Sequence, residues 1–186
     1  ESIHRAVDER AIHILAFKGL QPVGTVSLMT SDKFWPLPIS RYFDIEPVLK
    51  TRNCSEIIRL AVLPEMRNTP VSIGLIVLVF LLARSMGVEE MIIDVFVDDV
   101  KTIKLYKKFG FVEVGTYYSP SAVTVLTLQS KTPMEQDQSQ LRHFVRPLFA
   151  RLRPMFDFGD STQGVLDEMD RILSCDTGTA EEAEVG

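Results

Sequence analysis

The chain has few of the residues that cross-link small secreted proteins or hold metal ions. Its 186 residues include two cysteines, Cys54 and Cys175, and three histidines that share no motif. Two cysteines are too few for a disulfide framework, and they lack the spacing of metal ligands. We therefore expect a reducing, cytoplasmic environment and no bound metal, while a single bridge between the two cysteines stays open.

Long apolar runs and an excess of positive charge are missing as well. The most apolar stretch, residues 71–83, contains a glycine and is followed by Arg84, whereas a bilayer-spanning helix needs about 20 apolar residues. We expect no transmembrane segment, and the absence of a charged leader with an apolar run predicts that there is no export signal. The formal net charge of −5 argues against nucleic acid as a partner, because phosphate binding needs clustered lysine and arginine.

What the chain does contain is a large apolar fraction arranged as alternating strand and helix signals. Apolar residues make up 46% of the sequence, which is enough for one substantial core. The order of the signals predicts an α/β (α+β) fold, with a mixed, mostly antiparallel sheet around a central β-α-β unit and helices on its faces. The predicted elements are strands at residues 11–17, 23–29, 56–63, 91–97, 111–118 and 122–128, and helices at residues 72–86 and 98–109.

Two regions do not follow this alternation. Residues 31–52 contain three prolines and Trp35 without sustained periodicity, and they predict a long excursion over the surface or over a site. Residues 141–153 combine arginines with Phe and Leu and predict an amphipathic helix that Pro147 kinks, and a short helix follows at residues 162–173. We expect a core at residues 1–130, a C-terminal helical extension at 131–175 and a flexible acidic tail at 176–186.

Two motifs in the central unit resemble the GNAT superfamily of acyltransferases. They are SEIIRLAVLPEMR at residues 55–67 and KLYKKFGF at residues 104–111. In that superfamily the first motif leads into a phosphate-binding loop and helix, and the second ends the next helix. The segments QPVGTVSL, LPIS and EIIRLAV are more specifically similar to N-acyl amino acid synthases and their relatives, the acyl-homoserine-lactone synthases. The resemblance implies a GNAT fold and an N-acyltransferase that uses an acyl-pantetheine thioester.

The chain departs from the superfamily pattern at two places. Members that use coenzyme A have a glycine-rich loop whose N–H groups approach the diphosphate, whereas residues 67–72 read RNTPVS, in which proline removes a donor. The single phosphate of a carrier-bound arm needs less of a cradle. In addition, about ten residues precede the first hairpin, where the superfamily has a strand and one or two helices, and whether such elements were lost is left open.

The resemblance implies roles for individual residues. Glu56 would take the proton of the acceptor ammonium, and Tyr106 would protonate the leaving thiolate. A strand-end salt bridge for Glu56 and an aromatic packing role for Tyr106 are equally compatible with the sequence. The residues expected to bind the acyl-pantetheine arm are Leu60, Ala61 and Val62, through their main chain, and Arg67, Asn68, Ser72 and Ile73 around the loop and helix start.

Basic residues suggest two further contacts. Arg59 interrupts an apolar strand, and since a buried cation needs a carboxylate partner, it either pairs with Glu56 or binds the carboxylate of an acceptor. Other basic side chains form either a docking face for an acidic carrier protein or an ordinary solvated face. The docking candidates are Lys101, Lys104 and Lys108 on the second helix, and Arg142 and Arg146 in the C-terminal extension.

These observations predict transfer of a long-chain acyl group from acyl carrier protein to the amine of an amino acid or similar small molecule. The enzymatic alternative is an N-acetyltransferase that uses acetyl-coenzyme A. The alternative from another class is a non-catalytic GNAT-fold domain that binds acyl-pantetheine or a protein partner. The apolar residues give no acyl length, because core packing accounts for them equally well.

Overall fold

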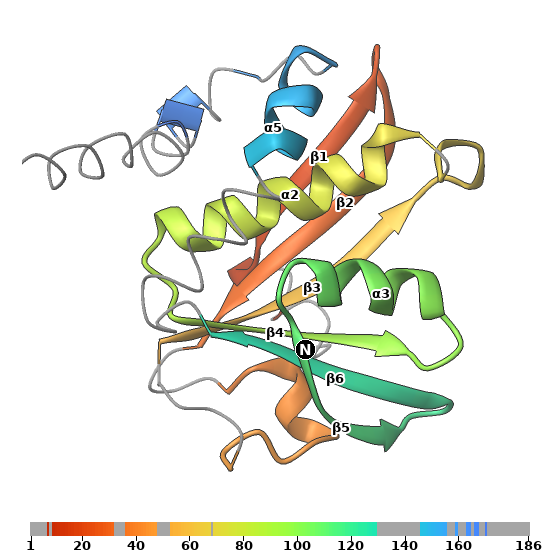
Figure 1. Cartoon of the computed structure of the whole chain (residues 1–186), viewed down its shortest axis with the longest axis vertical. Coiled ribbons are helices and arrows are strands. Elements are labelled where there is room, and N and C mark those ends of the chain that lie inside the picture. The colour runs from red at the N-terminus through yellow and green to blue at the C-terminus, as the bar shows by residue number, and fades with distance from the viewer. Residues whose placement is uncertain are drawn as a thin grey trace, which may run out of the picture.

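A computed structural model describes residues 7, 9–31, 36–47, 53–67, 69–129 and 146–155, together with residues 159, 163, 164, 166, 167 and 170. Six strands form one sheet that carries helices on one face (Figure 1). The strands are β1 (Ile12–Lys18), β2 (Gln21–Thr30), β3 (Cys54–Val62), β4 (Glu90–Phe96), β5 (Val112–Tyr118) and β6 (Ala122–Gln129). The helices are α2 (Pro70–Ser85), α3 (Val100–Lys108) and α5 (Arg146–Leu152), with 3-10 turns η1 (Pro38–Arg41), η2 (Pro64–Met66) and η4 (Arg153–Met155).

The sheet has the order β1-β2-β3-β4-β6-β5. Strands β3 and β4 run parallel because α2 carries the chain back across the sheet, and every other neighbouring pair is antiparallel. The hairpin between β1 and β2 turns at Gly19, whose φ of 61° is a conformation that glycine adopts without strain. The predicted fold class is therefore confirmed, including the central β-α-β unit.

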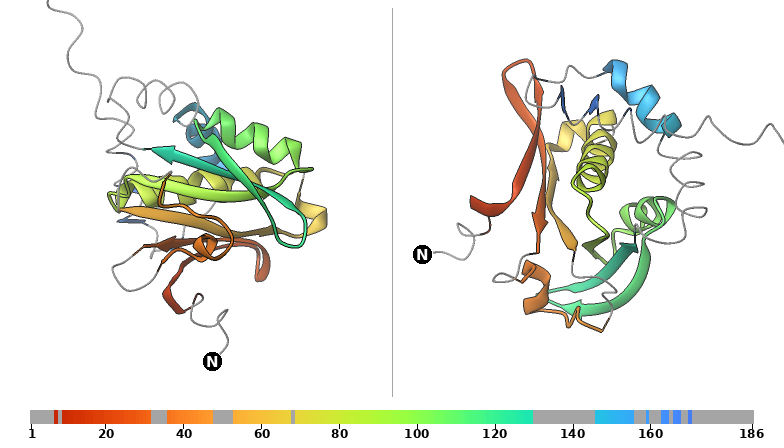
Figure 2. Two further views of the ribbon diagram at one scale, coloured as in Figure 1. Left: turned by 90° about the horizontal axis from the view of Figure 1, so that it is seen from below. Right: turned by 90° about the vertical axis from the view of Figure 1, so that its left-hand side faces the viewer.

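The main core lies between the sheet and its helices. Helix α2 is apolar on nearly all sides because it is covered by the sheet and by α5, and ten of its residues are buried. Phe149 and Leu152 of α5, together with Leu166, belong to the same core, so the C-terminal extension packs on α2. Figure 2 shows α2, α3 and α5 on one side of the sheet and η1 on the other.

A second, smaller core lies on the face of the sheet opposite the helices. Leu37, Ile39 and Ile45 from the segment at residues 36–47 pack there against sheet residues that include Ile92 and Val125. The predicted excursion thus covers this face. Cys54 is buried in the same core, and Cys175, the other half of the bridge that the sequence left open, lies outside the described residues.

The helix boundaries differ slightly from the prediction. Helix α2 begins at Pro70 rather than at Ser72, because the Thr69 side chain caps it by accepting a hydrogen bond from the N–H of Val71 (3.4 Å) and proline fits the first helical turn. Pro147 is the second residue of α5, and residues 141–145 of the predicted kinked helix lie outside the described residues. Within the described part of the chain, no helix is both long and apolar enough to cross a membrane.

Candidate active site

Strands β3 and β4 pair only where they begin. Their register runs from Cys54 opposite Glu90 to Ile57 opposite Ile93. Beyond that point β3 pairs only with β2 and β4 pairs only with β6 in the described structure, and the two strands separate (Figure 1). We call this separation the β3–β4 fork. The side of β3 that faces it has main-chain groups available to pair with an extended ligand, as in β-strand addition.

A β-bulge lies in β3 at the fork. Thr25 of β2 pairs with Ala61 and Ser27 with Ile58, so two residues of β3, Arg59 and Leu60, oppose one residue of β2. Arg59 has a φ of 57°, a left-handed conformation that costs free energy for a residue other than glycine. Bulges bend a strand and redirect its main-chain groups, and they concentrate next to active sites.

Three predicted binding residues surround this bulge. Ala61 is exposed, whereas Leu60 and Val62 are half-buried and pack their side chains against the main core. The side chains of Leu60 and Val62 are thus engaged in packing, and the main-chain binding role of the three residues stays a prediction. Arg59, by contrast, is exposed, so the expectation of a buried cation in the strand is wrong. The bulge turns this side chain out of the sheet's packed faces.

Glu56 lies on β3 just before the fork and is 3% exposed. Its Oε2 atom accepts a 2.9 Å hydrogen bond from the N–H of Ile39. Burial raises the pKa of Glu56 to about 8, the Ile39 bond lowers it and the negative charge of Asp94 raises it further. No ion pair joins Glu56 to Arg59 among the described residues, so of the two alternatives for Arg59 the pairing with Glu56 is not observed. The carboxyl group is mostly protonated at neutral pH.

Tyr106 lies on α3, in the main core, and is 1% exposed. Its ring packs edge-on to Phe111, with ring centroids 5.3 Å apart. The hydroxyl has no hydrogen-bond partner among the residues that the structure describes. Burial, followed by the negative charge of Asp99, raises the pKa of this phenol, so the hydroxyl stays protonated at neutral pH. The catalytic role expected for Tyr106 stays a prediction, and the packing role is met by its contact with Phe111.

Glu56 and Tyr106 lie on opposite faces of the sheet. The register partners of Glu56, Met29 and Ile92, belong to the smaller core, whereas Tyr106 belongs to the main core under the helices. The sheet therefore separates the two predicted catalytic side chains. They can act on one reacting group only where the sheet opens, which is the β3–β4 fork.

The loop before α2 uses part of its hydrogen-bonding capacity internally. The Ser72 hydroxyl donates to the carbonyl oxygen of Arg67 (3.3 Å), and the Val71 N–H donates to Thr69. The N–H of Ser72 lies in the first helical turn and has no partner within the helix, whereas the N–H of Ile73 donates the first hydrogen bond of the helix to the carbonyl oxygen of the cap residue Thr69. Arg67 is exposed. Asn68 lies outside the described residues.

Gly24 was not singled out from the sequence, yet it allows α2 to approach the fork. A Cβ atom at this position would lie 3.0 Å from Leu75 Cδ1, 3.2 Å from Val71 Cγ1 and 3.3 Å from the carbonyl oxygen of Ala61. Any side chain would therefore push the start of α2 away from the bulged part of β3. An isolated glycine inside a strand is a signal of such close approach.

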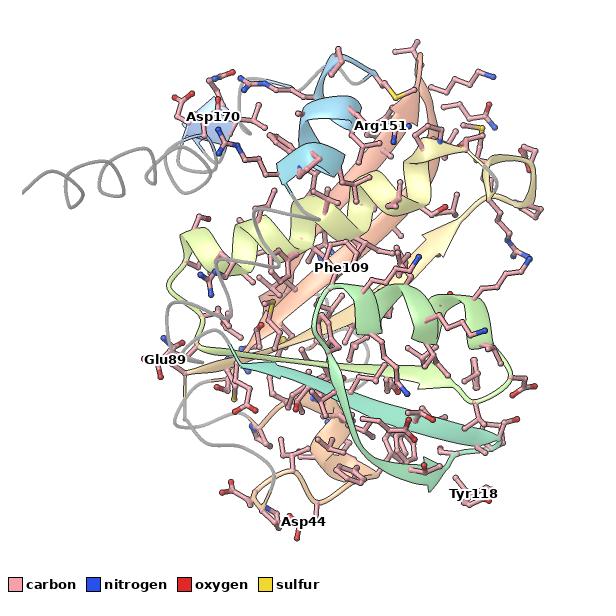
Figure 3. All side chains as sticks on the ribbon, viewed as in Figure 1. Asp44, Glu89, Phe109, Tyr118, Arg151 and Asp170 are labelled. Atoms are coloured by element: carbon pink, nitrogen blue, oxygen red, sulfur yellow. The ribbon has the colours of Figure 1, made fainter. Side chains whose placement is uncertain are left out.

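An aspartate and a tyrosine beside the fork were also missed. The Tyr117 hydroxyl of β5 donates a 2.5 Å hydrogen bond to Oδ2 of Asp94 on β4. The Tyr117 ring stacks on Tyr42, which follows η1, with ring centroids 5.6 Å apart. Tyr118, the next residue, points away from the sheet and is 81% exposed (Figure 3). No motif marks this pair, because β6 lies between its two strands.

The family model for the N-acyl amino acid synthase FeeM matches residues 3–126, well over half of the chain. The chain belongs to the FeeM family of N-acyl amino acid synthases. It is an N-acyltransferase, and this membership decides against the non-catalytic alternative. Comparison with curated protein sequences gives no match.

Solved structures show the same fold as this FeeM family member. FeeM from uncultured soil microbes is 17% identical, with a TM-score of 0.59 over 74% of this chain and 76% of that one. The IAA acetyltransferase from Bacillus cereus ATCC 14579 is 14% identical, with a TM-score of 0.51 over 69% of this chain and 85% of that one. An acetyltransferase from Bacillus subtilis in complex with CoA is 16% identical, with a TM-score of 0.50 over 68% and 84%. These likenesses confirm the GNAT fold.

The basic residues expected to dock a carrier protein are solvent-exposed in this FeeM family member. Lys101, Lys104 and Lys108 are all exposed on α3, whereas the neighbouring Lys107 forms a 3.1 Å ion pair with Glu113. Arg146 is exposed at the start of α5, and Arg142 lies outside the described residues. These positions are compatible with both a docking face and a solvated face.

Proposed function

We propose that the protein transfers a long-chain acyl group from the pantetheine thioester of acyl carrier protein to the amine of an amino acid or similar small molecule. The observation that carries this proposal is the β3–β4 fork, which carries a bulge and opens between a buried carboxyl on one face and a buried hydroxyl on the other. The amino acid acceptor is suggested by the activity that gives the FeeM family its name.

In this proposal the pantetheine arm pairs with the free side of β3 like an added strand. Its thioester oxygen meets a main-chain N–H near Leu60 to Val62, where the bulge redirects the peptide groups. One such oxyanion donor is worth about 3 to 4 kcal/mol in the transition state. The acyl chain and the thiol thus approach from the helix side, next to Tyr106.

The acceptor amine approaches from the opposite face, next to Glu56. The ammonium first loses a proton toward Glu56, and the neutral nitrogen then attacks the thioester carbon. The C–S bond breaks as the amide forms, and the departing sulfur takes a proton from Tyr106. The second proton that the nitrogen loses passes through water to the Tyr106 oxygen and restores its hydroxyl. Because the Glu56 carboxyl is 3% exposed, a water molecule is the expected carrier of the proton from the amine.

Two features favour a carrier-bound donor over coenzyme A. Pro70 has no N–H, and the N–H of Val71 is already bonded to Thr69, so the loop offers few donors to a diphosphate. The single phosphate of a carrier arm is matched by Arg67 and the N–H of Ser72 at the start of α2. The exposed lysines of α3 would then face the acidic surface of the carrier protein.

The test measures thiol release and products with matched donors. Purified protein is incubated with palmitoyl-acyl carrier protein, palmitoyl-coenzyme A or acetyl-coenzyme A and an equimolar mixture of the twenty amino acids, and mass spectrometry identifies the amides. We expect the carrier-bound palmitoyl donor to give the highest kcat/KM. A preference for acetyl-coenzyme A would overturn the proposed donor and make the protein a conventional N-acetyltransferase. The Glu56→Gln variant serves as the control for uncatalysed acylation.

A further inference from the structure

Asp94 lies at the β3–β4 fork, on the same face of the sheet as Glu56. It comes two residues after Ile92, the register partner of Glu56, and residues two apart on a strand point to the same face. Ile93 is the last residue of β4 that pairs with β3, so Asp94 is the first residue beyond the separation. Its side chain is only half-buried, whereas Glu56 is 3% exposed. Asp94 is therefore the carboxylate that a ligand at the fork reaches first.

The partner of the Asp94 carboxylate among the described residues is a neutral group, the hydroxyl of Tyr117. The Tyr117 hydroxyl donates to Oδ2, and Tyr42 in turn stacks on the Tyr117 ring with an interplanar angle of 9°. Burial, and then the hydrogen bond to Asp94, raise the pKa of Tyr117, so this phenol does not neutralise the carboxylate. The contact spans β4 and β5 and fixes the carboxylate at the edge of the fork.

The other oxygen of Asp94 has no partner within the described part of the chain. No hydrogen bond or ion pair joins Oδ1 to a described residue, and the negative charge of Asp94 raises the pKa of both Glu56 and Tyr117. A partly buried carboxylate is normally compensated by a cation. A metal ion does not fit this position, because no group of three or more His, Cys, Asp and Glu in the described residues is arranged to hold one.

We propose that Asp94 binds the ammonium group of the acceptor amine and that Tyr117 is a positioning residue that holds the Asp94 carboxylate at the fork. The inference rests on the proposed function in one respect, the entry of the amine from the Glu56 face. A protonated primary amine carries three donors and a full positive charge, which match the free Oδ1 atom. Binding there places the nitrogen beside the fork and close to Glu56. It also selects cationic amines over neutral nucleophiles of the same size.

The experiment separates acceptor binding from donor binding. The amino acid that the wild-type protein acylates fastest is varied at a saturating concentration of the thioester that it accepts. The variants are Asp94→Asn and Tyr117→Phe, with Asp98→Asn and Tyr118→Phe as matched controls, since Asp98 and Tyr118 are exposed. n-Butylammonium chloride and its neutral counterpart n-butanol are tested as inhibitors of the same reaction. Circular dichroism verifies that each variant is folded.

Loss of a charge-assisted hydrogen bond predicts specific changes. For Asp94→Asn we expect the KM of the amino acid and the inhibition constant of n-butylammonium to rise about tenfold or more, while the KM of the thioester and inhibition by n-butanol stay within about twofold. For Tyr117→Phe we expect a rise of about threefold to fivefold in the same two constants, with a smaller change in kcat.

Two outcomes would overturn the inference. In one, Asp94→Asn gives the same constants as Asp98→Asn. In the other, Asp94→Asn raises the KM of the amino acid and the KM of the thioester by the same factor. If Asp94→Asn does not fold, the test rests on Tyr117→Phe. In that variant the same two constants are compared with the wild type, namely the KM of the amino acid and the inhibition constant of n-butylammonium. A wild-type protein that prefers acetyl-coenzyme A would contradict the proposed donor and leave this test intact, because any accepted thioester can be used.

Discussion

The main-chain N–H of Ile39 donates a 2.9 Å hydrogen bond to Oε2 of Glu56, and this bond ties the segment at residues 36–47 to the middle strand of the sheet. The bond satisfies one oxygen of a carboxyl that burial would otherwise leave without compensation. It also strengthens when Glu56 ionises, because a carboxylate is the better acceptor. The ionisation state of Glu56 therefore affects how strongly the segment at residues 36–47 is held on the face of the sheet where Glu56 lies.

Activity should depend on the ionisation of Glu56. Its pKa of about 8 means that the base form is the minor form at neutral pH. We expect kcat/KM to fall about tenfold per pH unit below pH 8 and to level off above it, because a general base must be unprotonated. The Glu56→Gln variant keeps an acceptor for the N–H of Ile39 but cannot act as a base. It should lose most of the activity, and its remaining kcat/KM should no longer fall below pH 8. A wild-type profile that is flat from pH 6 to 9 would argue against Glu56 as the base.

Folding stability should fall as the pH rises toward 8. The folded protein holds a proton on Glu56 up to a pKa of about 8, whereas the unfolded chain releases it near the ordinary value of 4.5. The native state thus binds more protons in this window, and the free energy of unfolding decreases by up to about 1.4 kcal/mol per pH unit. Urea unfolding at pH 5, 6, 7 and 8 measures the slope of the unfolding free energy against pH. The slope should be markedly smaller in Glu56→Gln, and equal slopes would contradict the assignment to Glu56.

Tyr106→Phe separates packing from proton transfer. The substitution removes a buried hydroxyl that has no partner among the described residues, so we expect the free energy of unfolding to stay equal or to rise by about 1 kcal/mol. If the hydroxyl protonates the leaving sulfur, kcat should fall about tenfold to a hundredfold at the same time. Chemical denaturation and steady-state kinetics measure the two effects. An unchanged kcat would leave Tyr106 with a packing role only.

Gly115→Ala should loosen the cover of the Glu56 face. A Cβ atom at Gly115 would overlap the ring of Phe43, which packs directly on the backbone of β5. We expect a loss of about 1 to 3 kcal/mol in unfolding free energy, as in other overpacked sites. The second substitution Phe43→Leu should restore part of it. Gly159→Ala is the control, since a Cβ there has no heavy atom within 4 Å. Equal stabilities of Gly115→Ala and this control would refute the contact.

Charge reversal on α3 tests carrier docking. Lys104→Glu and Lys108→Glu change exposed residues, so stability should be unaffected. With a carrier-bound donor we expect KM to rise about threefold to tenfold, and more at low ionic strength, because like charges then oppose association. When acyl-coenzyme A is the donor, its KM should stay the same in both variants as in the wild type. Lys18→Glu, in the exposed end of β1, is the control. An identical effect on both donors would argue against docking.

Much of the fold was predictable from local patterns. The alternation of strand and helix signals placed the β-α-β unit correctly, because a parallel pair of strands needs a helical crossover and a long apolar helix such as α2 must be covered on both sides. The helix predicted at residues 98–109 is α3, which Asp99 caps by accepting a hydrogen bond from the N–H of Thr102. Prediction missed only a residue or two at most element ends.

The site was predictable only in part. The motif around Glu56 pointed to the strand that forks, but it did not reveal that Arg59 lies at a bulge with a positive φ, which turns a supposed buried cation outward. The contact between Asp94 and Tyr117 depends on the strand order β4-β6-β5, in which chain neighbours are not sheet neighbours. The close packing of Phe43 on Gly115 likewise joins a loop to a strand far along the chain.

Local sequence was enough to locate the strands and helices, and its motifs indicated the acyltransferase family, since hydrophobic periodicity and short motifs act over a few residues at a time. The tertiary structure alone decided that β3 and β4 part after Ile57 and Ile93, that Glu56 is sealed under Ile39, and that Asp94 stays within reach of solvent. These outcomes depend on how twisted strands and covering segments pack against one another, and no local pattern records that packing.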